Sequence, residues 1–177
     1  LCDSWRSKRE EASVLFQGMA SGHPSFGTFH AESLETLIRR LETPPINLPR
    51  TLVNSLDVVC VMIHSKERGK HQRRVNELVE IIEIGTVAGG TIKNVAFKLD
   101  PLNDQLIASK DYNLIKRMAI KSGRSIKVLL KELDLRTKLL KSIASQEISD
   151  FEGFVKIIKQ YYEDPKSVLK KFKIKIK

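Results

Sequence analysis

Two histidines seven residues apart, His23 and His30, bracket the part of the sequence whose residue types best suit chemistry. The run Gln17–Ala31 reads QGMASGHPSFGTFHA, in which a Gly-His pair, a short stretch of mixed residues and a Thr-x-His sequence follow one another. An imidazole can donate a hydrogen bond to an anionic oxygen and can exchange a proton near neutral pH. A single histidine at the end of a strand is commonly structural, so the residues alone leave a structural and a catalytic role open.

Other chemistry finds little support in the sequence. His64 and His71 are also seven apart, but neither histidine pair has the i, i+4 spacing of a zinc-protease helix. Two cysteines cannot build a zinc site or a disulfide framework. The glycines of residues 85–90 have the spacing of a phosphate-binding loop, yet Thr91 stands where that loop needs lysine. No G-x-S-x-G sequence is present. We therefore expect no metal site, no serine nucleophile and no phosphate-binding loop.

The elements around the two histidines are predicted from apolar spacing. Phe26–His30 alternates between two faces, as a short strand does. A helix should follow, because four apolar residues recur at i, i+3, i+4 and i+7 before Pro44 and Pro45 end it. These residues are Leu34, Leu37, Ile38 and Leu41. Residues 1–12 have no apolar period, and we expect them to be irregular or to fray into a helix.

The middle of the chain predicts a small antiparallel β section. Asp57–His64, Thr91–Leu99 and Gln105–Ala108 are expected to be strands. Val75–Ile84 fits a helix or a strand from its spacing alone.

The last third of the chain is predicted to be helical. Asp111 can cap a first helix, Ser149-x-x-Glu152 is a capping-box pattern, and Asp164-Pro165 is typical of a helix start. Apolar residues are expected to form one stripe along each of two helices. The first consists of Ile126, Leu129, Leu130, Leu133, Leu140 and Ile143, and the second of Phe151, Phe154, Val155, Ile158 and Tyr162.

Charge is unevenly distributed along the 177 residues. Residues 111–177 carry 17 Lys or Arg against 8 Asp or Glu, whereas residues 1–110 carry 14 against 13. A net charge of +9 in the last third suits an acidic protein, nucleic acid or anionic lipid, although solvated lysine-rich helix faces need no ligand. With few tyrosines for base stacking and no base-reading motif, we expect no specific nucleic-acid partner.

The histidine-containing run resembles the histidine box of the type II/type IV secretion ATPases, which power secretion systems, type IV pili and the archaellum. LFQGMASGHPSFGTFHAES, residues 15–33, is most similar to the archaeal branch. Four further stretches are similar to that family, so the resemblance covers roughly residues 11–170. They are Arg40–Pro45, Leu56–Val59, Arg73–Ile84, which the resemblance assigns as a strand, and Tyr161–Pro165.

The resemblance implies an α/β fold: the C-terminal half of a RecA-like motor domain, followed by a helical subdomain. The domains would be an irregular remnant at 1–12, the RecA-like part at 13–110 and the basic helical part at 111–177. His30 would face the nucleotide phosphates and His23 would support it, with Thr28 and Gly22 near the nucleotide. The complete motor uses ATP and Mg²⁺, forms a hexameric ring and acts on a membrane platform protein.

The sequence departs from the family at the motifs on which ATP hydrolysis depends most. It contains no Walker A loop, and LCDSWRSKRE stands where the Gly-Glu of Walker B is expected. We therefore expect the chain to be inactive alone and to bind no cofactor tightly, with a separate N-terminal half carrying Walker A as a possible partner. Without a signal peptide or a long apolar run, the expected location is cytoplasmic, at the inner face of the membrane. The alternative is a non-enzymatic module that docks on an intact motor ring. A third interpretation, supported by charge alone, is a basic nucleic-acid-binding protein that uses residues 111–177.

Overall fold

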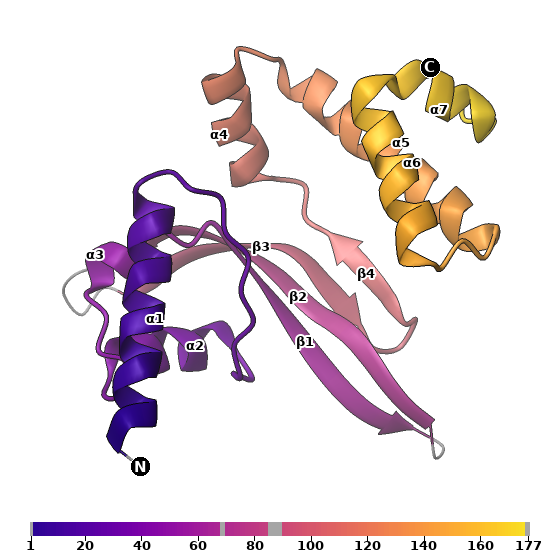
Figure 1. Cartoon of the computed structure of the whole chain (residues 1–177). Coiled ribbons are helices and arrows are strands. Elements are labelled where there is room, and N and C mark those ends of the chain that lie inside the picture. The colour runs from indigo at the N-terminus through magenta and orange to yellow at the C-terminus, as the bar shows by residue number, and fades with distance from the viewer. Residues whose placement is uncertain (1, 68–69, 85–89, 176–177) are drawn as a thin grey trace. The chain divides into compact units, whose positions relative to one another are not determined.

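The structure is a computed structural model that describes residues 2–67, 70–84 and 90–175 (Figure 1). It divides into two compact units, Leu1–Leu114 and Ile115–Lys177. The first is mixed α/β and the second is helical. Most of the glycine-rich stretch 85–90, excluded above as a phosphate-binding loop, lies outside the described residues. No helix in the described part of the chain is both long and apolar enough to cross a membrane.

The first unit begins with three helices and continues with four strands. The helices are α1 (Cys2–Ala20), α2 (Leu34–Glu42) and α3 (Arg50–Val53). The strands are β1 (Val58–Glu67), β2 (Lys70–Ile84), β3 (Thr91–Asp100) and β4 (Gln105–Ala108). The ambiguous segment Val75–Ile84 is therefore a strand, as the resemblance indicated.

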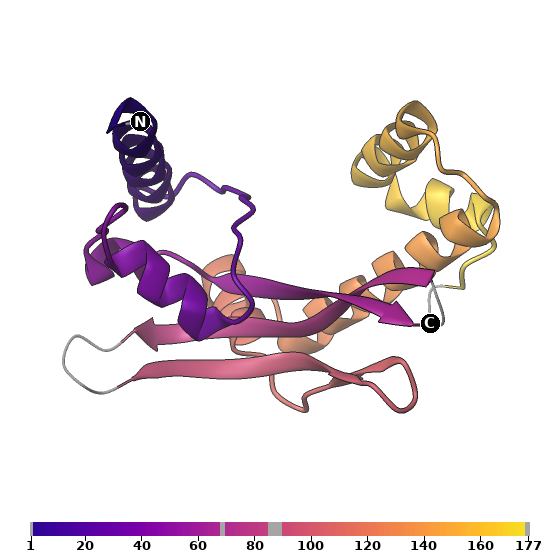
Figure 2. The same cartoon turned by 90° about the horizontal axis from the view of Figure 1, so that it is seen from below.

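The sheet is an antiparallel meander in the order β1-β2-β3-β4. Val59, Val79 and Val95 pair across its three longest strands. All three pack on one core with α1, α2 and α3, and Figure 2 shows α2 against one face of the sheet. The fold class is thus mixed α/β with antiparallel strands, which differs from the parallel sheet on which a RecA-like core is built.

Two sequence predictions are wrong in this unit. Residues 2–12 belong to helix α1 and are not irregular, because Ala12 and Phe16 pack on the core and the helix continues back from them. Residues 26–30 form no strand. Their alternation fits an extended backbone, but a strand also needs a neighbour to hydrogen-bond, and no described strand pairs with them.

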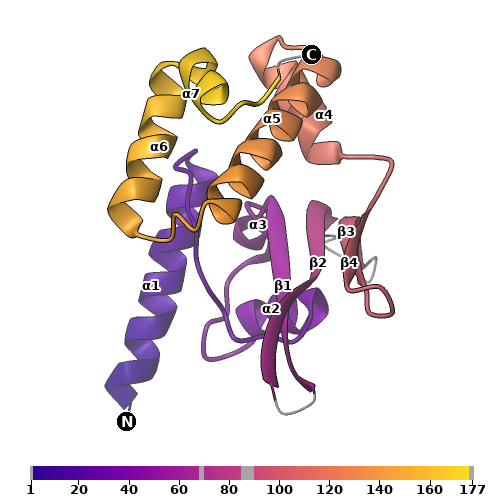
Figure 3. The same cartoon turned by 90° about the vertical axis from the view of Figure 1, so that its right-hand side faces the viewer.

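The second unit consists of helices packed around a small core. α4 (Asn113–Ser122) leads into it, followed by α5 (Ile126–Ser145), α6 (Phe151–Glu163) and α7 (Pro165–Lys171). α5, α6 and α7, which Figure 3 shows, all contribute residues to this core. The buried residues of this core are Leu135, Leu139, Ile143, Ile157, Tyr161, Val168, Leu169 and Phe172.

The predicted helix starts are partly right. Asp164 caps α7 through the amide of Ser167, with Pro165 in the first turn, as the sequence predicted. α6 is capped by Asp150 through the amide of Gly153, rather than by Ser149. A carboxylate at position 150 reaches that amide at 2.6 Å, so the helix begins one residue later than the capping box indicated.

Candidate functional site

All four predicted site residues lie on one exposed segment, residues 22–33, which joins α1 to α2 (Figure 2). Gly22, His23, Thr28 and His30 are each exposed to solvent. His30 is therefore neither at the end of a core strand nor enclosed in the core. The structure thus places the predicted residues on one exposed segment.

Gly22 has a structural role that its sequence position did not reveal. Its φ of +90° ends α1 in a Schellman motif, in which the Gly22 amide donates to Met19 O and the His23 amide donates to Gly18 O, both at 3.0 Å. A glycine is favoured here because any other residue is strained at positive φ. Gly22 thus sets the direction in which the chain leaves α1 toward His23.

Gly22→Ala is expected to destabilise the end of α1 by about 1 kcal/mol, because alanine is disfavoured in the left-handed region. A Cβ at this position would meet no heavy atom within 4 Å, so the cost comes from the backbone and not from a clash. Amide hydrogen exchange at Gly22 and His23 should accelerate. Gly18→Ala, at a helical glycine with equally open surroundings, is the control and should stabilise α1. Unchanged exchange in Gly22→Ala would contradict the capping role.

Hydrogen bonds around His23 favour one form of its ring. Ser21 Oγ donates to Gly18 O at 3.0 Å and lies 3.2 Å from His23 Nδ1. Because a hydroxyl has one proton, Ser21 can only accept from His23, which places the ring proton on Nδ1. Nε2 of the neutral ring is then the acceptor that faces other groups.

His30 is held by its backbone. Arg40 Nη1 on α2 donates to His30 O at 2.5 Å, while α2 itself is buried along its Leu34, Leu37 and Leu41 face. The imidazole of His30 remains exposed. Arg40 therefore fixes the position of His30 relative to α2 and leaves its side chain available to an external ligand.

Among the side chains that the structure describes, the most deeply buried charged group is Glu80 on β2, which the sequence did not single out. It is 4% exposed, and its two carboxylate oxygens accept three hydrogen bonds. The donors are Asn94 Nδ2 at 2.7 Å, Asn113 N at 2.8 Å and Leu114 N at 3.1 Å. Glu80 thus caps the N-terminus of α4, the role expected of Asp111, and its negative charge suits the helix dipole. The signal was a glutamate inside the apolar run VEIIEI.

A second polar cluster lies in the helical unit. Glu132 Oε1 on α5 accepts from Arg136 Nε at 2.9 Å and from Tyr161 Oη on α6 at 3.0 Å. Burial raises the pKa of Glu132, but the two hydrogen bonds together with the charges of Arg136 and Arg124 outweigh burial, and the pKa lies below its ordinary value. Burial and the bond to Glu132 raise the pKa of Tyr161. The cluster thus links α5 to α6 through hydrogen bonds to a charged side chain.

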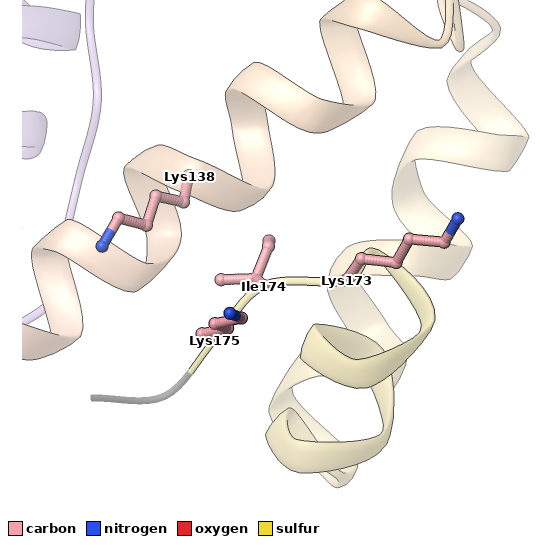
Figure 4. Close-up of a pocket in the computed structure, with 4 residues that line it drawn as sticks. All are labelled: Lys138, Lys173, Ile174 and Lys175. Carbon is pink, nitrogen blue, oxygen red and sulfur yellow. The ribbon is translucent and has the colours of Figure 1, made fainter.

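One hollow in the helical unit is lined mainly by lysines. This shallow hollow of about 340 Å³ is lined by Lys138, Lys173, Ile174 and Lys175. Figure 4 shows the side chains of Lys138 and Lys173 pointing away from each other. Lys138 is also paired with Asp134 at 2.5 Å. These lysines do not converge on one anion. In the part of the chain that the structure describes, no three His, Cys, Asp or Glu side chains gather as a metal ion would require.

Comparison with known proteins finds relatives of no known function. No protein-family model matches the chain. The uncharacterized protein MJ1287 of Methanocaldococcus jannaschii is 33% identical over 154 residues, which are 87% of this chain and 57% of that protein. MJ0900 of the same organism, also uncharacterized, is 32% identical over 157 residues, 86% of this chain and 28% of that protein. The chain therefore spans about half the length of the first relative and less of the second.

Proposed function

We propose that the chain corresponds to the C-terminal part of a secretion, pilus or archaellum assembly ATPase and contributes its histidine box. The observation that carries the proposal is the exposed segment 22–33, which presents His23, Thr28 and His30 to solvent from two fixed ends. Packing within the described chain does not account for these side chains, and the histidine box supplies a reason for them. The matches to longer archaeal proteins support a part that works within a larger chain.

The antiparallel sheet fits this proposal as an addition to the motor. We infer that the parallel strands of the RecA-like core belong to the rest of the complete motor, and that residues 22–33 meet that core. Residues 26–30 have the alternation of a strand and would gain a neighbouring strand there. The exposed apolar rings of Phe26 and Phe29 would be covered by the same contact.

In the complete motor His30 would donate a hydrogen bond to a phosphate oxygen of ATP. Hydrogen bonds to charged oxygens are stronger than neutral ones, and losing one on hydrolysis can release a loop. His23 would support the segment through Ser21, as its 3.2 Å contact indicates. ATP, Mg²⁺, the hexameric ring and the membrane platform protein all belong to this complete motor, acting at the cytoplasmic face of the membrane.

The isolated chain is expected not to turn over ATP, because it has no Walker A loop to hold the phosphates and Mg²⁺. To test the histidine box, the matching segment of MJ0900 is replaced by this chain and Mg²⁺-dependent phosphate release is measured. His30→Ala should lower kcat of that chimera by about 100-fold, the usual effect of removing a donor to a developing charge.

His64→Ala is the control for this test, because His64 is an exposed histidine on β1, outside the histidine segment. It should leave kcat unchanged. Sustained hydrolysis by the isolated chain that His30→Ala abolishes would overturn the expectation that the chain is inactive alone. An active chimera that is indifferent to His30→Ala would overturn the role of the histidine box.

A non-enzymatic docking module is the second candidate. It is favoured by the apolar side chains that α5 and α6 expose on a unit rich in lysine. An inactive chimera that still assembles with the intact relative would favour this second candidate.

A further inference from the structure

Helix α5 has two apolar faces, and only one of them is used in the core. Leu129, Leu135, Leu139 and Ile143 are buried. A second row faces solvent, with exposed fractions between 38% and 48%. We call this row the α5 seam; it consists of Ile126, Leu130, Leu133 and Leu140, with Thr137 between the last two.

The spacing of the α5 seam is that of a coiled-coil interface. Its members follow one another at intervals of four, three, four and three residues, which is the alternation of the a and d positions of a heptad. The hydroxyl of Thr137 already donates to Leu133 O at 2.8 Å, so docking would leave it with its partner. A row with this spacing fits the apolar stripe of a second helix.

Charges beside the α5 seam determine what that second helix must carry. Lys127, Asp134 and Lys141 occupy the flanking e positions of the heptad. Asp134 forms an ion pair with Lys138 at 2.5 Å. The other two e positions, Lys127 and Lys141, are basic. On the g flank, Leu129 and Ile143 are buried, and Arg136 is paired with Glu132 at 2.9 Å. The net charge that remains beside the α5 seam, once these two ion pairs are formed, is therefore positive.

We propose that the α5 seam binds an amphipathic helix of a partner protein that carries leucine-like residues at a and d and acidic residues beside them. A second copy of this chain would bring lysine against lysine at the flanks, which disfavours pairing. A lipid surface would suit basic residues on both flanks, whereas the g flank is neutralised. The proposal is independent of the proposed ATPase function, because it uses no residue of segment 22–33.

The test uses two synthetic peptides, each about four heptads long, with leucine at a and d. One has glutamate at all e and g positions and the other has lysine there, and in both the like charges weaken self-pairing. Binding to the full chain is measured by fluorescence anisotropy. The acidic peptide should bind at least about tenfold more tightly than the basic one, since flanking charges set partner choice in coiled coils.

Variants distinguish binding at the α5 seam from nonspecific binding elsewhere on the chain. Leu133→Asp should weaken binding of the acidic peptide by about tenfold or more, as loss of a central apolar contact does. The double variant Lys127→Glu and Lys141→Glu should invert the preference toward the basic peptide. Lys131→Glu, an exposed lysine of α5 away from the seam, is the matched control and should preserve the preference. Circular dichroism confirms that each variant is folded.

Four outcomes would overturn the proposal. The first is that neither peptide binds a folded chain, and the second is that both bind equally well. The third is a dimer of the chain that Leu133→Asp dissociates. The fourth is binding through the seam to vesicles containing phosphatidylglycerol, with no binding of the acidic peptide. The third assigns the seam to a second copy and the fourth assigns it to a lipid surface.

Discussion

Replacing Glu80 with alanine is expected to lower the free energy of unfolding of the first unit by about 3 kcal/mol, because buried hydrogen-bond donors would lose a charged acceptor. Glu80 accepts from Asn94 Nδ2 and from the amides of Asn113 and Leu114. Alanine leaves both amides at the start of α4 without this acceptor. Amide hydrogen exchange at Asn113 and Leu114 should therefore accelerate together with the loss of stability seen in chemical denaturation.

Glu80→Gln separates the shape of the side chain from its charge. The glutamine oxygen can replace Oε2, which accepts from Asn94 Nδ2 and Asn113 N. Its NH₂ group then faces the amide of Leu114, where Oε1 stood at 3.1 Å, and two donors oppose each other. The expected cost lies between those of wild type and Glu80→Ala, with the faster exchange concentrated at Leu114.

Glu83→Ala is the matched control for this series. Glu83 is a glutamate on the same strand, exposed to solvent. Its replacement should change stability by less than about 0.5 kcal/mol, as for most surface positions. A Glu80→Ala protein as stable as Glu83→Ala, with unchanged exchange at Asn113, would show that Glu80 does not hold the start of α4.

The first unit was predictable from sequence wherever one pattern decided the outcome. The period of Leu34 to Leu41 and the prolines after it predict α2, which runs from Leu34 to Glu42. The residues 105–108 between a turn and a polar stretch predict β4, which has those bounds. In each case the local pattern and the tertiary packing agree, so local reasoning is sufficient.

Residues 26–30 and Asp111 show where local reasoning fails. A strand depends on a neighbour that sequence alternation does not specify, and 26–30 has none among the described strands. The start of α4 is capped by a carboxylate 33 positions earlier in the chain, since the Asn113 amide donates to Glu80. Both outcomes depend on distant segments of the chain, which the local pattern cannot contain.

The helical unit shows a different failure, because its helices have more than one apolar face. The sequence predicted one stripe that includes Leu130, Leu133 and Leu140, but these residues are exposed, whereas Leu135 and Leu139, outside the predicted stripe, are buried. On α6 the core contains Ile157 and Tyr161, while Phe151 and Tyr162 are exposed. Periodicity finds an apolar stripe, but with two stripes it cannot say which one packs within the chain.

For the candidate site, the sequence located the segment but not its supports. His23, Thr28 and His30 lie on one exposed segment, whereas the sequence predicted a strand ending at His30. Only the structure reveals that Gly22 ends α1 and that Arg40 holds His30 O. Both depend on backbone geometry, which residue types alone do not determine.

Leu139→Ala is expected to destabilise the helical unit by about 3 kcal/mol, because it removes buried methyl groups and leaves a cavity. Leu139 is 2% exposed and lies in the core with Leu135, Ile157 and Tyr161. Chemical denaturation measures the loss of free energy of unfolding. Hydrogen exchange of the α5 and α6 amides shows whether that loss lies within this unit.

Leu133→Ala is the matched comparison, on the same helix but on the exposed α5 seam. It should cost less than about 1 kcal/mol, because partly exposed positions bury little surface on folding. The two variants delete the same atoms, so any difference between them reports which face of α5 packs within the chain. Equal losses would mean that the seam is part of the core, and it would then be unavailable to a partner helix. A large loss at Leu139 with little loss at Leu133 leaves the seam stable, apolar and open to a partner.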